Sequence, residues 1–305
     1  MIGQRTIAKQ VSLTGIGLHS GKKVTMNLIP QDAGTGIRFI RTDLKNAKPL
    51  RAYAGNVSAT NNNTTIGEGP EAIHTVEHLM ATLYGLGIDN LLIEISGPEV
   101  PIMDGSGASF VFICREIGVR ELNHAKKFLV VKDKVEVKQG DSWVTIEPFE
   151  NFTINSTIVF PHPAISNQSI NFEFSCENFI HEISRARTFG MLKDVDSLQR
   201  RGLIKGGSLD NAIVLDDYNV VNTDGLRYEN EFVRHKVLDT IGDVALLGFE
   251  LIGKITTYKS GHYLHNKLCR KLLSDQNTYE VVGASAVKEP FLANLRLPSL
   301  ISCNY

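Results

Sequence analysis

The 305-residue chain is poor in cysteine, and the positions of its cysteines exclude two kinds of site. The cysteines are far apart in the sequence and form no CxxC motif, so neither a disulfide framework nor a cysteine-ligated zinc site is expected. Reduced thiols are typical of the cytoplasm, which is where we expect this protein. The four residues are Cys114, Cys176, Cys269 and Cys303.

Net charge and long apolar runs are also lacking. The formal net charge is −1, so no basic field attracts nucleic acid, and an anionic ligand must be met by a local cluster of Lys or Arg. The longest apolar stretch, 244–253, is far shorter than the roughly 20 residues that span a bilayer. The first ten residues lack the apolar core of a signal peptide. We therefore expect no nucleic-acid partner and no transmembrane segment. Separately, we expect a small-molecule partner and a monomer.

The pattern of strands and helices runs through the chain twice. With 305 residues, the length favours two domains, and the polar HAKK segment near residue 125 is the candidate boundary between 1–124 and 125–305. Residues 1–60 alternate as strands, and a hairpin with a Gly-Asp turn follows the boundary. Further elements are predicted as helices at 71–86, 106–119, 183–205 and 231–247, and as strands at 91–97 and 249–258.

A shift of 161 positions places one amphipathic helix on another. HTVEHLMATLYGLGI (74–88) then overlies HKVLDTIGDVALLGF (235–249), and both segments end in Leu-Gly and an apolar residue before a strand. His78 falls on Asp239, and Gly87 falls on Gly248. We infer two halves of similar plan, whose helices can face each other and bring their polar residues into one cleft.

These helices carry residue types that bind metal. His235 and Asp239 are four residues apart and project from one helix face, with Asp243 one turn further on. A histidine from the other helix would complete the three protein ligands of a catalytic zinc site. His78 is the natural candidate, and Glu77 beside it is placed to take a proton from water.

A second interpretation uses the same segment. His74, Glu77 and His78 match the H-x-x-E-H pattern of inverted zinc peptidases, in which both histidines bind the metal. Spacing alone does not decide between these two ligand sets.

Two other segments are candidates for the site. His262 follows Gly261 at the end of an apolar strand, where it could serve as a general acid oriented by Asp243, or lie in a surface loop. TGIGLHSGKK (14–23) resembles a phosphate-binding loop, but Lys23 stands where Ser or Thr is required. We interpret that segment as a hairpin turn.

Together, the motifs closely resemble those of the zinc-dependent UDP-3-O-acyl-N-acetylglucosamine deacetylases, which catalyse the committed step of lipid A synthesis in Gram-negative bacteria. The matching segments follow the family's order over nearly the whole chain. They are TGIGLHSG (14–21), TVEHLMA (75–81), GLGIDN (85–90), PIMDGS (101–106), SRARTFG (184–190), GLIKGGSLDNAIV (202–214), VRHKVLDTIGD (233–243) and YKSGH (258–262).

The resemblance implies an α+β fold of two domains with similar topology, a duplicated β-α-α-β plan whose helices are sandwiched between two sheets. It implies a zinc amidohydrolase that removes the N-acetyl group of an acylated UDP-amino sugar, with one Zn²⁺ per chain; a His₂Asp site also accepts Fe²⁺. A zinc peptidase and a non-catalytic nucleotide-sugar or lipid-binding protein are the alternative functions.

The resemblance also implies roles for individual residues. His78, His235 and Asp239 correspond to the zinc ligands, Glu77 to the base, and His262 to the catalytic histidine. The other implied roles are oxyanion binding by Thr188, partnership with His262 by Asp243, substrate contacts by Lys236, Lys259, Leu18 and His19, and an acyl passage in the insert 189–214, lined by Phe189, Met191, Ile204 and Val214.

Overall fold

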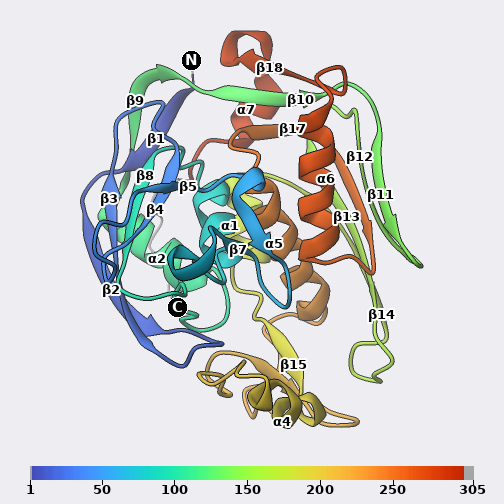
Figure 1. Cartoon of the computed structure of the whole chain (residues 1–305). Helices are drawn as coiled ribbons and strands as arrows, with labels where there is room; N and C mark the ends of the chain where they lie inside the picture. Colours follow the sequence, from blue (N-terminus) through green and yellow to red (C-terminus); the bar gives the residue numbers. More distant parts are fainter. Residues whose placement is uncertain (1, 299–305) are drawn as a thin grey trace.

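The computed structural model of the protein describes residues 2–298, which form an α+β architecture. A sheet of N-terminal strands and a sheet of C-terminal strands lie on opposite sides of a layer of helices (Figure 1). The predicted fold class, with helices between sheets, is confirmed.

The N-terminal sheet has the strand order β2-β3-β8-β4-β5. Strand β3 alternates in burial, with Val24, Met26 and Leu28 turned into the core, because successive side chains of a strand point to opposite faces. The bounds in this half are β1 Gly3–Ile7, β2 Val11–Ile16, β3 Lys23–Pro30, β4 Ile37–Arg41, β5 Leu50–Arg51, η1 Ala54–Asn56, β6 Val57–Ala59, β7 Thr65–Ile66, η2 Gly69–Glu71, α1 Glu77–Gly85, β8 Leu91–Ile95, α2 Ala108–Ile117 and β9 Val119–Ala125.

The C-terminal sheet is built around the long strand β17, which pairs with β12, β10 and β13. The bounds in this half are β10 Lys127–Val131, β11 Val135–Gln139, β12 Ser142–Glu147, β13 Phe152–Val159, β14 Asn167–Glu173, α3 Cys176–Asn178, η3 Phe179–Ile183, β15 Phe189–Met191, α4 Leu192–Arg200, β16 Ile213–Leu215, α5 Glu231–Ala245, β17 Glu250–Tyr258, α6 His262–Ser274, β18 Tyr279–Gly283, η4 Ala284–Ala286 and α7 Glu289–Asn294.

The two halves share a topology. The path β2-β3-β8-β4-β5 has its counterpart in β11-β12-β17-β13-β14, with antiparallel and parallel pairings in the same places. Helices α1 and α2 flank β8 as α5 and α6 flank β17. Gly87 and Gly248, which overlie each other in the sequence repeat, both adopt positive φ just after the helices α1 and α5. Such a conformation favours glycine at a helix C-terminus.

Helices α1 and α5 pack directly against each other between the sheets. Gly242 makes this close approach possible, because a Cβ atom at this position would lie 2.1 Å from the carbonyl oxygen of Glu77. The apolar side chains of both helices are therefore buried in one continuous core, which includes Leu79, Leu83 and Leu238.

Two predicted helices differ in the structure, and one helix was not predicted. The helix predicted from 71 begins at Glu77, since Thr75 has a φ of 58° that no α-helix accommodates. The helix predicted for 183–205 spans only α4, because the backbone groups of residues 187–189 bond across the chain rather than within a helix. Helix α6 was not predicted, and His262 is its first residue rather than a loop residue.

The predicted turns are correct. β2 and β3 form an antiparallel hairpin across 14–23, and Gly140 and Asp141 form the two-residue turn between β11 and β12. The insert 189–214 forms a small lobe in which β15 pairs in parallel with β16, and α4 and β15 project away from the main body (Figure 1).

Among residues 2–298, no helix combines the length and apolar character that crossing a bilayer requires. Cys114, Cys176 and Cys269 are free, buried thiols. Burial raises the pKa of Cys114 to about 12 and that of Cys176 to about 11, so both are inert at neutral pH. Cys303 lies outside the described residues.

Candidate metal centre and active site

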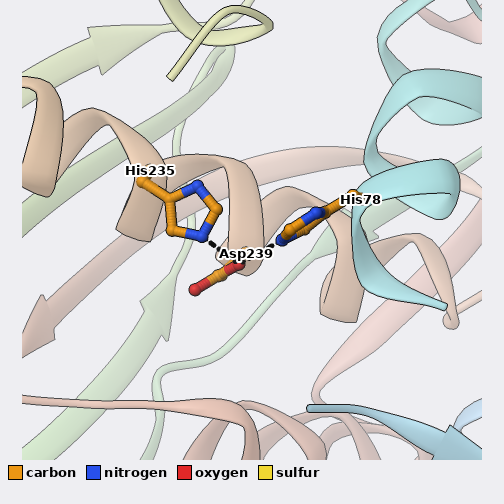
Figure 2. Close-up of side chains that lie close together, drawn as sticks. All are labelled: His78, His235 and Asp239. Carbon is orange, nitrogen blue, oxygen red and sulfur yellow. Dashed lines mark ion pairs between the residues drawn. The ribbon is translucent and has the colours of Figure 1, made fainter. Parts of the chain in front are cut away.

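His78, His235 and Asp239 converge at the contact between α1 and α5. Figure 2 shows His78 projecting from α1 toward His235 and Asp239, which come from successive turns of α5. Asp239 Oδ1 lies 3.6 Å from His78 Nε2 and 3.4 Å from His235 Nε2, and the three potential ligand atoms lie within 4.8 Å of one another. This spacing leaves room for a cation coordinated by all three.

The surroundings of these side chains suit a metal ion. Asp239 Oδ1 is buried and, within residues 2–298, has no hydrogen-bond partner. His235 Nδ1 donates to the carbonyl oxygen of Ala186 at 3.0 Å, which fixes the ring and leaves Nε2 unprotonated toward Asp239. Burial lowers the pKa of His235 to about 3, so the imidazole is neutral and can act as a ligand.

Lys236 binds the second oxygen of the Asp239 carboxylate. Its Nζ donates to Asp239 Oδ2 at 2.8 Å and lies 5.4 Å from the ring centroid of Phe189. Burial opposes a charged Asp239, but the ammonium of Lys236 holds the pKa of this carboxyl well below its usual range. A charged carboxylate with a free oxygen therefore faces the two imidazoles.

Glu77 is the first residue of α1 and lies beside the three potential ligands. Its Oε2 accepts the backbone N–H of Thr64 at 3.0 Å, and its Oε1 lies 4.0 Å from His262 Nε2. Burial raises the pKa of Glu77 above its usual range. A carboxylate tuned in this direction can take up a proton near neutral pH, as a general base must.

His262 lines the same cavity and is paired with Asp243. Its Nδ1 donates to Asp243 Oδ2 at 2.8 Å. Burial opposes the charged imidazole, but Asp243, Asp239 and Glu77 together raise the pKa of His262 to about 10. An imidazolium held in this way can donate a proton.

Residues of both halves line one cavity of about 430 Å³ around this centre. It contains most of the side chains that the sequence predicted. These are Leu18, His19, Glu77, His78, Thr188, Phe189, Ile204, His235, Lys236, Asp239, Lys259 and His262. Asp243 lies behind His262 and reaches the cavity through it.

Three of the predicted residues lie elsewhere. His74 is outside α1 and accepts or donates a hydrogen bond with Thr65 Oγ1 at 2.9 Å, so the H-x-x-E-H spacing does not bring it to His78. Met191 and Val214 belong to the insert but are not among the residues that line this cavity. Leu198, from α4 of the same insert, does line it and was not predicted.

The turn after β2 reaches the cavity because Glu99 holds it. Its carboxylate accepts the backbone N–H groups of His19 at 2.8 Å and Ser20 at 2.7 Å. A Cβ atom at residue 17 would overlap this carboxylate and Ser20 Oγ, so glycine there lets the carboxylate stay on the two N–H groups. The sequence gives no local signal for this contact, since about 80 residues separate its partners.

A buried ion pair fixes the segment that carries Thr188. Arg187 Nε donates to Glu231 Oε1 at 2.9 Å, and both side chains are almost fully buried. Glu231 begins α5, so the pair ties the 184–189 segment to the helix that bears His235. The carbonyl of Ala186 that orients His235 belongs to this same segment.

Two imidazoles and a carboxylate around one point, with a buried carboxylate and an imidazole–carboxylate pair beside them, are the groups of a mononuclear metal hydrolase. Comparison with known families agrees. Residues 4–274 match the family model described as UDP-3-O-acyl N-acetylglycosamine deacetylase, and the chain belongs to this family.

Individual relatives support the same assignment. The chain is 50% identical over 285 residues to a UDP-3-O-acyl-N-acetylglucosamine deacetylase of Haemophilus influenzae strain PittEE, covering 92% of this chain and 93% of the relative. It is 51% identical over 281 residues to the protein of that name from Myxococcus xanthus strain DK1622, covering 92% and 90%. The protein of that name from Sodalis glossinidius strain morsitans is 50% identical over 285 residues, covering 92% and 93%.

Proposed function

We propose that this protein is a zinc-dependent amidohydrolase. Its substrate is UDP-3-O-(3-hydroxyacyl)-N-acetylglucosamine, and it releases acetate and the free amine in the committed step of lipid A synthesis. The observation that carries the proposal is the cluster of His78, His235 and Asp239, with Glu77 and His262 lining the same cavity. The family match over residues 4–274 supports the substrate class.

The metal ligands in this proposal are His78, His235 and Asp239, and the metal is Zn²⁺. Two imidazoles with one carboxylate are a donor set that both zinc and iron(II) accept, so metal analysis of the purified protein decides between them. A cation held there supplies Lewis acidity, which polarises a carbonyl and makes water a better nucleophile near neutral pH.

The other residues move protons and hold the substrate. Glu77 accepts the proton of the attacking water, because its second oxygen is already held by Thr64 and its pKa is raised by burial. His262 gives its Nε2 proton to the departing amine nitrogen as the C–N bond breaks. The Thr188 hydroxyl donates to the developing oxyanion, a contribution that is usually large in acyl transfer.

Substrate recognition is proposed to involve the cavity wall. Lys236 and Lys259 meet the anionic part of the substrate, and Leu18 and His19 contact it at the mouth of the cavity. The acyl chain lies against the insert 189–214, whose Phe189 and Ile204 line the cavity. Met191 and Val214 line the passage beyond it.

A direct test is acetate release from the purified, metal-analysed protein. The Glu77→Ala variant should keep the metal and lose about 10²-fold or more in kcat, the usual range for removal of a general base. A Glu77→Ala variant with full metal and full activity would refute the role. The peptidase alternative predicts that His74→Ala strips the metal, whereas our ligand set predicts retention. A non-catalytic binding protein would release no acetate.

We further propose that the chain divides into domains 1–124 and 125–305, acts as a monomer and is located in the cytoplasm. The repeated topology supports the division. The buried, free thiols support a reducing location. Light scattering at working concentration tests the monomer.

A further inference from the structure

We propose that His265 is a positioning residue, which fixes the Asp243 carboxylate for His262 and thereby acts on the reaction without touching the substrate. This inference rests on the proposed function. His265 lies one turn after His262 on α6 and is buried, and it is absent from the residues that line the cavity.

The Asp243 carboxylate is held at both oxygens by three side chains. Oδ2 accepts from His262 Nδ1 and from His265 Nδ1, each at 2.8 Å. Oδ1 accepts from Thr64 Oγ1 at 2.5 Å. An ionised carboxylate only accepts hydrogen bonds, so both imidazoles carry a proton on Nδ1. With His265 in place, the carboxylate cannot rotate away from His262 without breaking a second buried hydrogen bond.

His265 is itself oriented by its other ring nitrogen. Nε2 lies 2.9 Å from Ser260 Oγ, just before α6 begins, and the backbone N–H of His265 bonds to the carbonyl of Gly261 at 3.1 Å. The contacts form a chain from Ser260 through His265 and Asp243 to His262. A histidine that only filled space would not need a partner at each ring nitrogen; here both partners are met.

The charged groups around His262 come from several elements. Glu77 faces it from α1, and Asp239 and Asp243 face it from α5. The Nδ1–H bond to Asp243 fixes the imidazole ring, and Nε2 then lies 4.0 Å from Glu77 Oε1, in the cavity. His265 maintains that orientation through Asp243.

The test compares His265→Ala with His265→Asn, whose amide N–H can replace the Nδ1 donor. Hydrogen bonds to charged groups are worth about 1.5–3 kcal/mol, so H265A should lower kcat about ten- to a hundredfold with KM and metal content unchanged. H265N should recover most of this loss. Ser260→Ala removes one neutral hydrogen bond and should lower kcat about fivefold. His124→Ala, an exposed histidine, is the control.

A second readout does not depend on activity. In histidine-labelled protein, the His262 Nδ1–H resonance should exchange with solvent at least tenfold faster in H265A than in the wild type, and H265N should restore slow exchange. Unchanged kcat and exchange in H265A, or an H265N variant as impaired as H265A, would overturn the inference. If H265A does not fold, kcat and the exchange rate of H265N and S260A test the role of His265 instead. A wild-type protein that releases no acetate refutes the proposed function, while the exchange measurement still decides the role of His265.

Discussion

Replacing Gly242 by alanine tests whether the contact between α1 and α5 sets the metal centre. The added Cβ would lie 2.1 Å from the carbonyl oxygen of Glu77 and 2.8 Å from its carbonyl carbon. Non-bonded carbon atoms prefer separations of about 3.5–4.0 Å, so the helices must move apart locally by about 1 Å. Both contacting groups are backbone, and no side-chain rotation can relieve the overlap.

This displacement carries Glu77 and the adjacent proposed ligand His78 away from His235 and Asp239. Metal–ligand distances tolerate only about 0.2 Å, and a misplacement of about 1 Å can cost about 10²-fold in rate. We therefore expect G242A to bind the metal at least tenfold more weakly and to lose about 10²-fold in kcat. Overpacking should lower the free energy of unfolding by about 1–3 kcal/mol, which leaves a folded protein to assay.

The assays are chelator competition for metal affinity and acetate release at saturating metal. Gly283→Ala is a matched control, since its Cβ would meet nothing within 4 Å and its φ is −83°. We expect this control to match the wild type. If G242A retained wild-type metal affinity and a kcat within twofold, the close approach of the helices would not be what aligns the site.

Other perturbations give equally specific results. As the pH rises, activity should increase when Glu77 loses its proton and decrease when His262 loses its own. The decrease should occur near or below pH 10, because a bound cation lowers the pKa of both groups. His262→Gln should abolish the alkaline limb of the pH profile. Glu231→Gln should cost about 3 kcal/mol in urea denaturation by leaving Arg187 poorly paired, whereas Glu182→Gln, at a more exposed ion pair, should cost under about 1 kcal/mol. A substrate without the acyl chain should lose up to about fourfold in kcat/KM per methylene, and equal efficiency would refute the passage.

The sequence alone predicted those parts of the site whose geometry follows from helical periodicity. His235 and Asp239 are neighbours on any α-helix, and the internal repeat predicted that the helix bearing His78 would face them. Gly87 and Gly248 mark the same helix end in each half. These features depend on local geometry, which spacing encodes.

Spacing failed where the backbone leaves its regular path. The positive φ of Thr75 removes His74 from α1, and no residue in HTVEH announces it. His265 could have been found, since Leu264, Leu268 and Leu272 recur at helical spacing and extend a helix past His262.

Contacts between segments that are far apart in the sequence could not be predicted from it. Thr64 holds Asp243 across 179 positions, and the carbonyl of Ala186 orients His235 across 49. Such partners are backbone groups or small polar side chains, whose chemistry is common to every protein. Only the folded chain identifies which of them acts.

The division of the three proposed ligands between α1 and α5 has a consequence for the assembly of the molecule. A cation bound by all three is a cross-link between segments separated by more than 150 positions, so its binding free energy also favours docking of one half on the other. Neither half carries the complete set. A chain whose halves were separated would therefore lack the complete set of metal-binding side chains.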